Sequence, residues 1–285
     1  MSESELNSLL LNVFKNRAEV KNAAQILKDY CRNRFAKPSS VDPIQFAEIN
    51  LLLLKLANNE GFEILEFSPL SPLGTSSIHK TINQNNIVSA LRRVEVVSDI
   101  TNVMALEISK RIKENSSIDK IDLAASHRLT RGQGFDNREY TAHFKVIGMV
   151  SSWKDKGKFK GEEDALIKHI TTYVKMFKDV YQIPIKELEL NLNVLSNIDN
   201  IDFNKFVERV SNCIEGLSVN VVLIENSNNY YSNIKFGIKL KSMDYPIIDG
   251  GFVNWVSTFT QNKKRRSLIS GIGTELMYKI MKSKK

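Results

Sequence analysis

Two long strand-like segments joined by a polar loop constrain the fold of this chain most. Residues 120–129 and 140–152 are rich in apolar residues, and the loop between them, TRGQGFDNRE, is polar and contains two glycines. This pattern predicts an antiparallel hairpin, because so short a polar loop joins strands that run in opposite directions. A sheet is then expected to form around this hairpin.

The remaining segments read as strands more often than as helices that cross between parallel strands. Helical periodicity is present at 4–35, 44–58, 99–115, 162–181 and 201–217, and a closing helix follows residue 273. Strands are expected at 62–67, 86–97, 186–195, 220–226, 234–240, 245–251 and 267–273. We therefore predict an α+β fold in which an antiparallel β-sheet is flanked by helices.

A proline- and serine-containing break separates the first helical stretch from the rest of the chain. Residues 36–43 read AKPSSVDP, and two prolines within eight residues interrupt helical periodicity. We predict an N-terminal helical extension at 1–40 and one larger domain at 41–285.

Composition limits the compartment and the partners. The 285 residues carry a formal net charge of +8, and basic runs at 263–266 (KKRR) and 282–285 (KSKK) hold much of it. Such runs form either a solvated loop and tail or a nucleic-acid contact. No apolar run is long enough for a membrane span, and the two cysteines lack metal-ligand spacing. We expect a cytoplasmic protein that binds neither membrane nor metal.

Guanidinium groups gather on the central hairpin. Arg128, Arg131 and Arg138 lie on or beside its loop, together with Gln133. Arginine pairs with phosphate oxygens in a bidentate manner, so this set predicts a phosphate or carboxylate site. The plain alternative is a solvated loop.

Four further short motifs have both a functional and a structural interpretation. Asp99 and Thr101 open a helix, where Asp99 either contacts an amino group or caps the helix. On an expected strand, Tyr230 and Tyr231 point to opposite faces, so that one lines a pocket. The pairs Gly250 with Gly251 and Gly271 with Gly273 allow a ligand to approach the backbone, or simply form turns.

In chain order, these motifs resemble the catalytic domain of the class II aminoacyl-tRNA synthetases. The resemblance runs from residue 44 to residue 285 and is closest to histidyl-tRNA synthetase and its paralogue, the regulatory subunit of ATP phosphoribosyltransferase. INLLLLKLANNEGFEILEFSPL resembles motif 1, RLTRGQGFDNREY resembles motif 2, and SGIGTEL occupies the place of motif 3. VVSDITNVMALEISKR, NSNNYYSNIKF and DGGFVNWV are similar to three histidine-specific stretches.

The resemblance implies a site, a cofactor and a partner. It places ATP or phosphate, with Mg, at Arg128, Arg131, Gln133, Arg138, Gly271 and Gly273. It places an amino-acid pocket at Asp99, Thr101, Tyr230, Tyr231, Gly250 and Gly251. It also implies a homodimer formed through the motif 1-like region.

The departures from the family pattern concern the groups that perform the chemistry. Arginines of the family fall on Val97, Asn226 and Leu276, and the Gly-Gly motif has Phe252 and Asn254 in place of Arg and Asp. Each missing donor removes roughly 2–4 kcal/mol of transition-state stabilisation. The family's anticodon-binding domain has no counterpart in these residues.

We therefore expect a non-catalytic, synthetase-like protein that binds an amino acid or a nucleotide and acts as a regulatory or accessory subunit beside a protein partner. One alternative is an ATP-dependent enzyme that activates an amino acid for an acceptor other than tRNA. Another is a nucleic-acid-binding accessory protein whose RNA contact is formed by Lys263, Lys264, Arg265 and Arg266.

Overall fold

The computed structural model describes residues 1–79, 82–134, 141–195, 203–224 and 230–283. The chain divides into two units, which we describe one at a time. The first contains Met1–Ser40, Ser68–Asp99 and Arg128–Phe144, and the second contains Val41–Phe67, Ile100–His127 and Lys145–Lys285. The tip of the central hairpin therefore belongs to the first unit, and its long strands belong mainly to the second.

Two helices and a small sheet make up the first unit. The helices are α1 (Glu3–Glu19) and α2 (Ala23–Arg32). The sheet has the order β2 (Leu70–Pro72), β4 (Val94–Val96), β3 (Ser89–Ala90), preceded by the 3-10 turn η1 (Gln84–Asn86). Both strand pairs are antiparallel.

The helical stretch expected at 4–35 is divided into two helices, because α1 ends at Glu19 and α2 begins at Ala23. The Asn22 side chain accepts the backbone N–H of Gln25, and the Gln25 side chain accepts the backbone N–H of Asn22. This reciprocal capping box satisfies N–H groups that a helix start otherwise leaves without partners. The capping box therefore starts a new helix at a point where the spacing of apolar residues shows no interruption.

The expected strand at 86–97 is also wrong as one element. It is split into β3 and β4 by a turn at Arg92 and Arg93, whose φ angles of 72° and 60° are left-handed. In the middle of β4, Glu95 is fully buried, and its carboxylate accepts the backbone N–H groups of Gly74 and Ser76 at 2.8 and 2.9 Å. Burial alone would raise the pKa of Glu95, but these bonds and one from Gln84 hold it below its ordinary value.

The second unit is built on a sheet, as predicted, and this sheet has eight strands. The strand order is β1 (Glu63–Ile64), β5 (Lys120–Thr130), β6 (His143–Lys154), β11 (Arg265–Ile272), β10 (Ile248–Val253), β9 (Ser232–Leu240), β7 (Leu188–Leu195) and β8 (Ser218–Ile224). Among the described pairings, the two at the sheet edges, β1 with β5 and β7 with β8, are parallel, and those from β6 through β11, β10 and β9 to β7 are antiparallel. The α+β class is confirmed, with β1 shorter than the expected strand at 62–67.

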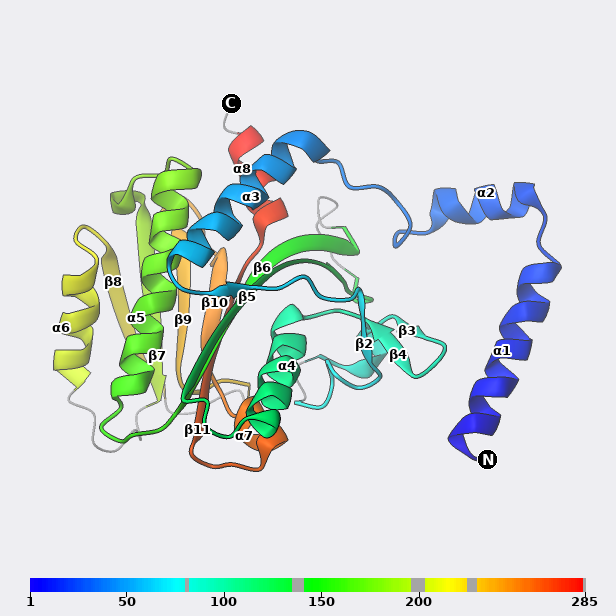
Figure 1. Ribbon diagram of the computed structural model, residues 1–285. Helices are drawn as coiled ribbons and strands as arrows, with labels where there is room; N and C mark the ends of the chain where they lie inside the picture. Colours follow the sequence, from blue (N-terminus) through cyan, green and yellow to red (C-terminus); the bar gives the residue numbers. More distant parts are fainter. Residues whose placement is uncertain (80–81, 135–140, 196–202, 225–229, 284–285) are drawn as a thin grey trace. The chain divides into compact units, whose positions relative to one another are not determined.

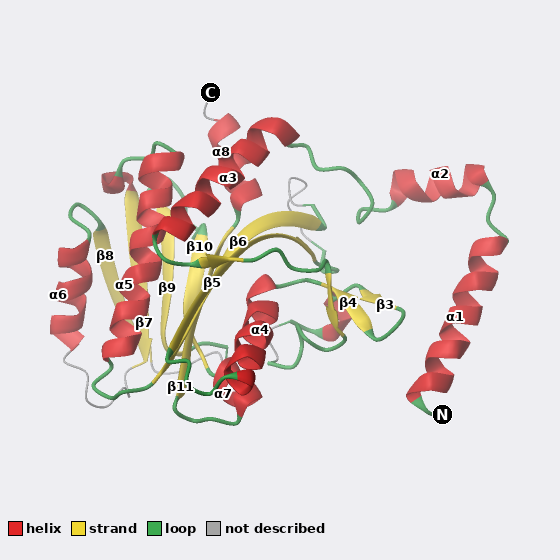
Figure 2. Cartoon of the chain, viewed as in Figure 1, coloured by secondary structure: helices red, strands yellow, loops and turns green. Residues whose placement is uncertain are grey.

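Helices cover the two faces of this sheet unequally (Figures 1 and 2). A Cβ on Gly148 of β6 would lie 2.7 Å from Ile100 of α4 (Ile100–Glu114), which packs with α7 (Trp255–Thr260). Gly148 pairs with Gly271, whereas the next residue, Ser270, hydrogen-bonds His169 of α5 (Lys160–Lys175). Successive strand residues point to opposite faces, so α4 and α5 lie on opposite sides. We name these the α4 face and the α5 face.

The α5 face carries the main core. Helix α5 contacts α3 (Pro43–Asn59) and α6 (Phe203–Cys213), and α3 contacts α8 (Thr274–Ser283). Helix α5 continues as a π-turn, η2 (Met176–Val180), and a 3-10 turn, η3 (Ile185–Glu187), leads into β7. Apolar side chains of the middle strands alternate toward this layer and are fully buried; they include Leu190, Leu192, Phe236 and Ile238.

A buried polar chain crosses the interface between α5 and the sheet. His169 hydrogen-bonds the hydroxyls of Ser151 at 2.9 Å and Ser270 at 2.7 Å, and Tyr173 reaches the same Ser270 at 2.9 Å. Ser151 in turn donates to Asp122. Burial lowers the pKa of His169 to about 3, so the ring is neutral at physiological pH.

No helix among the described residues combines the length and apolar character that a bilayer crossing requires.

Candidate functional site

A cluster of a carboxylate, an ammonium and a phenol lies on the α4 face of the sheet. The Tyr231 hydroxyl donates to Asp249 Oδ2 at 2.7 Å, and Lys235 Nζ lies 3.1 Å from Asp249 Oδ1. Lys235 is also 5.7 Å from the centre of the Tyr231 ring. The side chains of Asp249 and Lys235 are 46% and 35% exposed, although Asp249 Oδ1, the atom nearest Lys235, is itself buried. We name Tyr231, Lys235 and Asp249 the charged cluster.

The Gly-Gly pair is part of this arrangement, although not as the turn that one interpretation expected. Both glycines are inside β10. A Cβ on Gly251 would lie 2.5 Å from the Tyr231 ring and 2.8 Å from the Ile234 carbonyl. A Cβ on Gly250 would lie 2.6 Å from both Phe236 and Ser270 on the other face. The pair therefore makes room for protein side chains on both sides of the strand.

The tyrosine pair precedes its strand. Because β9 begins at Ser232, Tyr230 and Tyr231 are outside it, and the argument that they alternate on a strand is wrong. Their rings lie edge to face with centres 4.3 Å apart, and Tyr230 also contacts Trp255 at 5.9 Å. The preceding residues, including Asn226, are outside the described part of the chain.

The turn after β11 has the predicted form. Strand β11 ends at Ile272 and α8 begins at Thr274, with Gly273 between them. Gly271 pairs with Asp249, and a Cβ there would meet only the Ile147 carbonyl at 3.7 Å. The backbone beside the charged cluster is therefore open on the α4 face. Leu276, in place of the family's ATP-binding arginine, is a half-buried apolar side chain of α8.

Thr101 is buried in the first turn of α4. It is 5% exposed, and its methyl group would lie 3.3 Å from a Cβ on Gly148. Thr101 thus packs against β6. Its role in an amino-acid pocket stays a prediction.

In the first unit, the hairpin arginines already have protein partners. Arg128 Nη1 hydrogen-bonds His143 Nδ1 at 3.0 Å, and Arg131 Nε donates to the Ser98 carbonyl at 3.2 Å. Arg131 also lies 5.4 Å from the centre of the Phe144 ring. These contacts hold the guanidiniums beside the hairpin.

The N-terminal extension contacts the loop of this hairpin. Arg34 donates to the backbone carbonyls of Gly132 and Gln133, the latter at 2.9 Å. Nearby, the Lys37 carbonyl lies 2.6 Å from His143 Nε2. We name residues 34–37 the strap. It brings a further guanidinium to the loop where phosphate binding is expected.

Three other positions named in the sequence analysis are described by their burial or by their place in the chain. Asp99 is half-buried immediately before α4, which suits a helix start. Val97 is fully buried, so the position of the family's arginine is apolar here. Arg138 lies outside the described residues.

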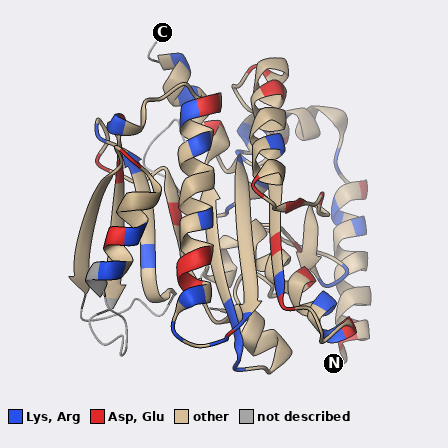
Figure 3. Ribbon diagram, turned by 60° about the vertical axis from the view of Figure 1, so that its left-hand side comes forward, with Lys and Arg blue, Asp and Glu red and all other residues tan. Residues whose placement is uncertain are grey.

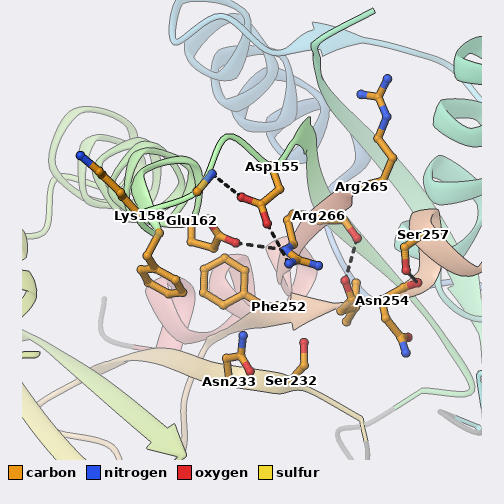
Figure 4. A pocket seen from close by; sticks show the side chains of 14 residues that line it. Asp155, Lys158, Glu162, Ser232, Asn233, Phe252, Asn254, Ser257, Arg265 and Arg266 are labelled. Carbon is orange, nitrogen blue, oxygen red and sulfur yellow. Dashed lines mark hydrogen bonds and ion pairs between the residues drawn. The ribbon is translucent and has the colours of Figure 1, made fainter. Parts of the chain in front are cut away.

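The structure contains a pocket that the sequence did not predict (Figure 4). Its volume is about 590 Å³, and it opens where β6, β9, β10 and β11 meet the loops at their ends. Arg266 lies between two carboxylates, 2.8 Å from Asp155 and 3.4 Å from Glu162. Burial raises the pKa of Glu162. The pocket is further lined by Gly157, Lys158, Phe159, Ser232, Asn233, Phe252, Val253, Asn254, Ser257, Arg265 and Ser267.

This pocket is separate from the Gly271–Gly273 turn. Arg265 pairs with Lys154 at one end of β11, whereas Ile272 pairs with Ile147 at the other. Arg266, one of the three basic residues of the lining, is already matched by two carboxylates, which does not favour an added phosphate beside it. The basic run 263–266 supplies Arg266 to it, and Phe252 and Asn254 of the Gly-Gly motif also line it.

One of the four basic residues predicted to contact RNA, Arg265, is buried in the protein interior. Arg265 is 3% exposed and donates to the carbonyls of Ile118 and Asp119. Burial lowers the pKa of Arg265. Lys263 and Lys264 are exposed in the turn before β11, so the contact stays a prediction that rests mainly on them.

Among the described residues, no group of three or more His, Cys, Asp or Glu side chains is placed to hold a metal ion.

Comparison with known proteins decides the fold. No family model and no curated protein sequence matches the chain. A histidyl-tRNA synthetase from Nostoc superposes with a TM-score of 0.65 at 14% identity, covering 88% of this chain and 75% of that one. An ATP phosphoribosyltransferase regulatory subunit/histidyl-tRNA synthetase from Bacillus halodurans superposes with a TM-score of 0.62 at 12% identity, covering 87% and 83%.

The chain has the class II synthetase fold. A histidine–tRNA ligase subunit from Alicyclobacillus acidocaldarius, with a TM-score of 0.61 at 9% identity, is covered over 97% of its length, and 87% of this chain is covered. The resemblance inferred from the motifs is thus confirmed at the level of the fold. At these identities the likeness does not extend to activity.

Proposed function

We propose that this chain is a non-catalytic, synthetase-like protein that binds a free amino acid and acts as a regulatory or accessory subunit. The observation that carries the proposal is the charged cluster. Asp249 offers a carboxylate to an α-ammonium group, and Lys235 offers an ammonium to an α-carboxylate. Both are exposed on the α4 face, beside the open backbone at Gly271.

The charge pattern favours an amino acid over a nucleotide. A triphosphate needs several cations without anionic partners. Lys235 is paired with Asp249, and the next lysine on the same face, Lys239, is paired with Glu189 at 3.3 Å. A zwitterion adds no net charge to such a surface, so it is accommodated with less cost.

Two positions support a binding role without adenylate formation. Val97 is fully buried and Leu276 is half-buried, so neither supplies the positive charge that the family places there. ATP with Mg as a cofactor, and a homodimer through the motif 1-like region, remain proposals taken from the resemblance.

Isothermal titration of the purified chain against the twenty amino acids, first without ATP, tests this proposal. We expect one amino acid or a small set to bind. Asp249→Asn and Lys235→Met should each weaken binding about tenfold to a hundredfold, since each removes one charged partner. Asp244→Asn, an exposed carboxylate in the turn between β9 and β10, is the matched control and should bind as the parent does.

Three results would speak against the proposal. Amino-acid binding that is unchanged in Asp249→Asn would place the ligand elsewhere. ATP binding that depends on Arg128, followed by pyrophosphate exchange, would instead support the amino-acid-activating enzyme. If neither ligand binds, nucleic-acid binding that weakens steeply with salt and with changes at Lys263 and Lys264 becomes the better explanation.

A further inference from the structure

The pocket at Arg266 has the size of a ligand site, and the proposed function does not use it. Its volume of about 590 Å³ lies within the range of about 300–1,000 Å³ that is usual for pockets that hold small molecules. Phe252 of its wall contacts Trp153, which packs against Gly161 of α5. The pocket therefore lies on the α5 side, whereas the charged cluster lies on the α4 face.

The charged groups inside this pocket already have partners in the protein. Arg266 donates to Asp155 at 2.8 Å and to the Lys263 carbonyl at 3.1 Å, and its Nε lies 3.4 Å from Glu162 Oε1. The second oxygen of Asp155 accepts the backbone N–H of Gly157 at 2.7 Å. A charged ligand would have to displace one of these ion pairs and leave a charge uncompensated. The interior of the pocket therefore favours an uncharged ligand.

The two other basic residues of the lining direct their charge elsewhere. Arg265 donates to the carbonyls of Ile118 and Asp119. In Figure 4, the Lys158 side chain extends away from the other labelled side chains. Figure 3 shows basic and acidic residues in succession in the first turn of α5 and in the loop before it, so no single sign of charge dominates the rim. Long-range attraction thus selects neither an anion nor a cation.

A bulge in β9 supplies the first free hydrogen-bonding group. Gly251 pairs with Lys235, whereas the next residue, Phe252, pairs with Ser232, so β9 has two extra residues at this point. Asn233 lies in the bulge with a left-handed φ of 64°, which asparagine tolerates better than most residues. Its side chain makes no hydrogen bond to another described residue, and Figure 4 shows it directed toward Phe252. Bulges commonly re-aim a side chain toward a site in this way.

Asn254 supplies the second free group. It occupies the N-cap position of α7, where asparagine is preferred because its side chain caps the helix. Here the side chain makes no capping hydrogen bond, and it is exposed at the pocket wall. An amide that neither caps its own helix nor bonds to a described neighbour is available to a ligand.

These free groups define the chemistry of the ligand. A carboxamide donates and accepts at the same time, which matches the adjacent donor and acceptor on the edge of a nucleobase. Phe159 and Phe252, with ring centres 5.9 Å apart, form an apolar wall for a flat ring. The Ser232 hydroxyl also makes no hydrogen bond to another described residue, so it can pair with a sugar hydroxyl. A sugar alone lacks the flat polar edge that carboxamides match.

We propose that this pocket binds an uncharged nucleoside. Asn233 and Asn254 contact the edges of the base, the base lies against Phe159, and the ribose faces Ser232. The site takes no phosphate, because its guanidinium is already held by two carboxylates. It is distinct from the ATP site that the resemblance implies at the Gly271–Gly273 turn.

Isothermal titration of the full chain with adenosine, guanosine, cytidine and uridine tests the proposal. We expect one of these nucleosides, or a subset, to bind. Asn254→Ala should weaken binding about tenfold, since it removes one amide pair with the base. Asn233→Gly should do the same while leaving the left-handed backbone unstrained. Asn59→Ala, at an exposed amide of α3 outside the pocket, is the matched control and should bind as the parent does.

The 5′-monophosphate of the bound nucleoside separates a base site from a phosphate site. We expect it to bind within about threefold of the nucleoside, because a phosphate gains affinity mainly from cations that lack anionic partners. A monophosphate that binds more than about tenfold tighter would assign the pocket to a phosphate and overturn the proposal.

Other results would also overturn it. Nucleoside binding that is unchanged in both asparagine variants would place the ligand elsewhere, and dependence on Arg128 would place it at the ATP site. Equal binding of ribose alone would assign the pocket to a sugar. Binding of short single-stranded RNA without binding of any free nucleoside at millimolar concentration would assign it to a macromolecule, and binding of neither would leave the pocket without a base.

The asparagine variants leave the charged cluster intact. Amino-acid titration of the same proteins therefore reports separately on the proposed function, and failure of one proposal is distinguishable from failure of the other. Urea unfolding of each variant shows whether a loss of nucleoside binding comes from the pocket or from the fold. A loss that accompanies an unchanged denaturant midpoint supports the assignment.

Discussion

The Tyr231 ring occupies the space where a side chain on Gly251 would begin. The Tyr231 hydroxyl donates to Asp249, which precedes Gly251 by two residues on β10. Gly251→Ala would place a methyl group 2.5 Å from that ring and 2.8 Å from the Ile234 carbonyl. We expect it to destabilise the fold by about 1–3 kcal/mol, as overpacking does, and to weaken amino-acid binding. Urea unfolding and titration measure the two effects. Gly134→Ala, where no atom lies within 4 Å, is the control and should change neither.

Val97→Arg restores the charge that the family carries at this position, but here the side chain is fully buried. Burying an unpaired guanidinium costs about 3–5 kcal/mol, so we expect poor folding or a large fall in the denaturant midpoint. Leu276→Arg, at a half-buried position, should cost less than about 1 kcal/mol. A Val97→Arg protein as stable as the parent would show that this position can still hold a cation.

The buried histidine of α5 should make stability depend on pH. The pKa of His169 is about 3 in the folded chain, below its ordinary 6.5, because burial disfavours the charged ring. Its stabilising contribution is complete above pH 6.5 and is lost as pH falls toward 3, by up to about 1.4 kcal/mol per pH unit. Unfolding free energies at pH 7.5, 6, 5 and 4 should fall more steeply for the parent than for His169→Phe.

The contribution of His79 to the pH dependence of stability must be distinguished from that of His169. Burial lowers the pKa of His79 to about 4, which gives a contribution of the same sign. His79→Asn should flatten the profile between pH 6.5 and about 4, whereas His169→Phe should flatten it from pH 6.5 to about 3, so a further measurement between pH 4 and 3 separates the two. Identical slopes for the parent and His169→Phe would rule out the buried neutral ring.

The ion pairs of the pocket should be coupled. Arg266→Met removes the partner of Glu162, whose side chain is 8% exposed, and of Asp155. We expect a loss of about 1–2 kcal/mol, because a buried carboxylate is left unpaired. Glu162→Gln should reduce the cost of Arg266→Met, and a double-mutant cycle measures that coupling. Lys263→Met, in the exposed turn, should stay within about 0.5 kcal/mol of the parent; additive effects of the first pair would contradict the coupling.

Local patterns predicted the parts of the fold that depend on local physics. The central hairpin, helix α4 and the passage from β11 through Gly273 to α8 follow from periodicity and turn chemistry, and all three are present. The apolar repeat does not locate the break at Asn22, because capping depends on two polar side chains.

The candidate site was harder to predict, because its residues are brought together by the register in which neighbouring strands pair. Lys235 and Asp249 are ordinary charges in the sequence, and only the pairing of β9 with β10 brings them together. The pocket at Arg266 draws its lining from three strands, two helices and the loop after β6. No single stretch of sequence carries its pattern.

The strap contacts the hairpin loop through hydrogen bonds to the backbone of the loop. Arg34 takes the carbonyls of Gly132 and Gln133, and every amino acid supplies a carbonyl. Gln133 can therefore be replaced without losing its bond to Arg34, whereas Gly132 cannot take a side chain, because a Cβ there would lie 2.9 Å from the Asn86 carbonyl oxygen; replacement of Arg34 removes both bonds. In a mutational scan, we expect substitutions of Gln133 to be tolerated better than substitutions of Arg34, which donates the hydrogen bonds. The chain is thus free to adapt the chemistry of the loop while keeping its position.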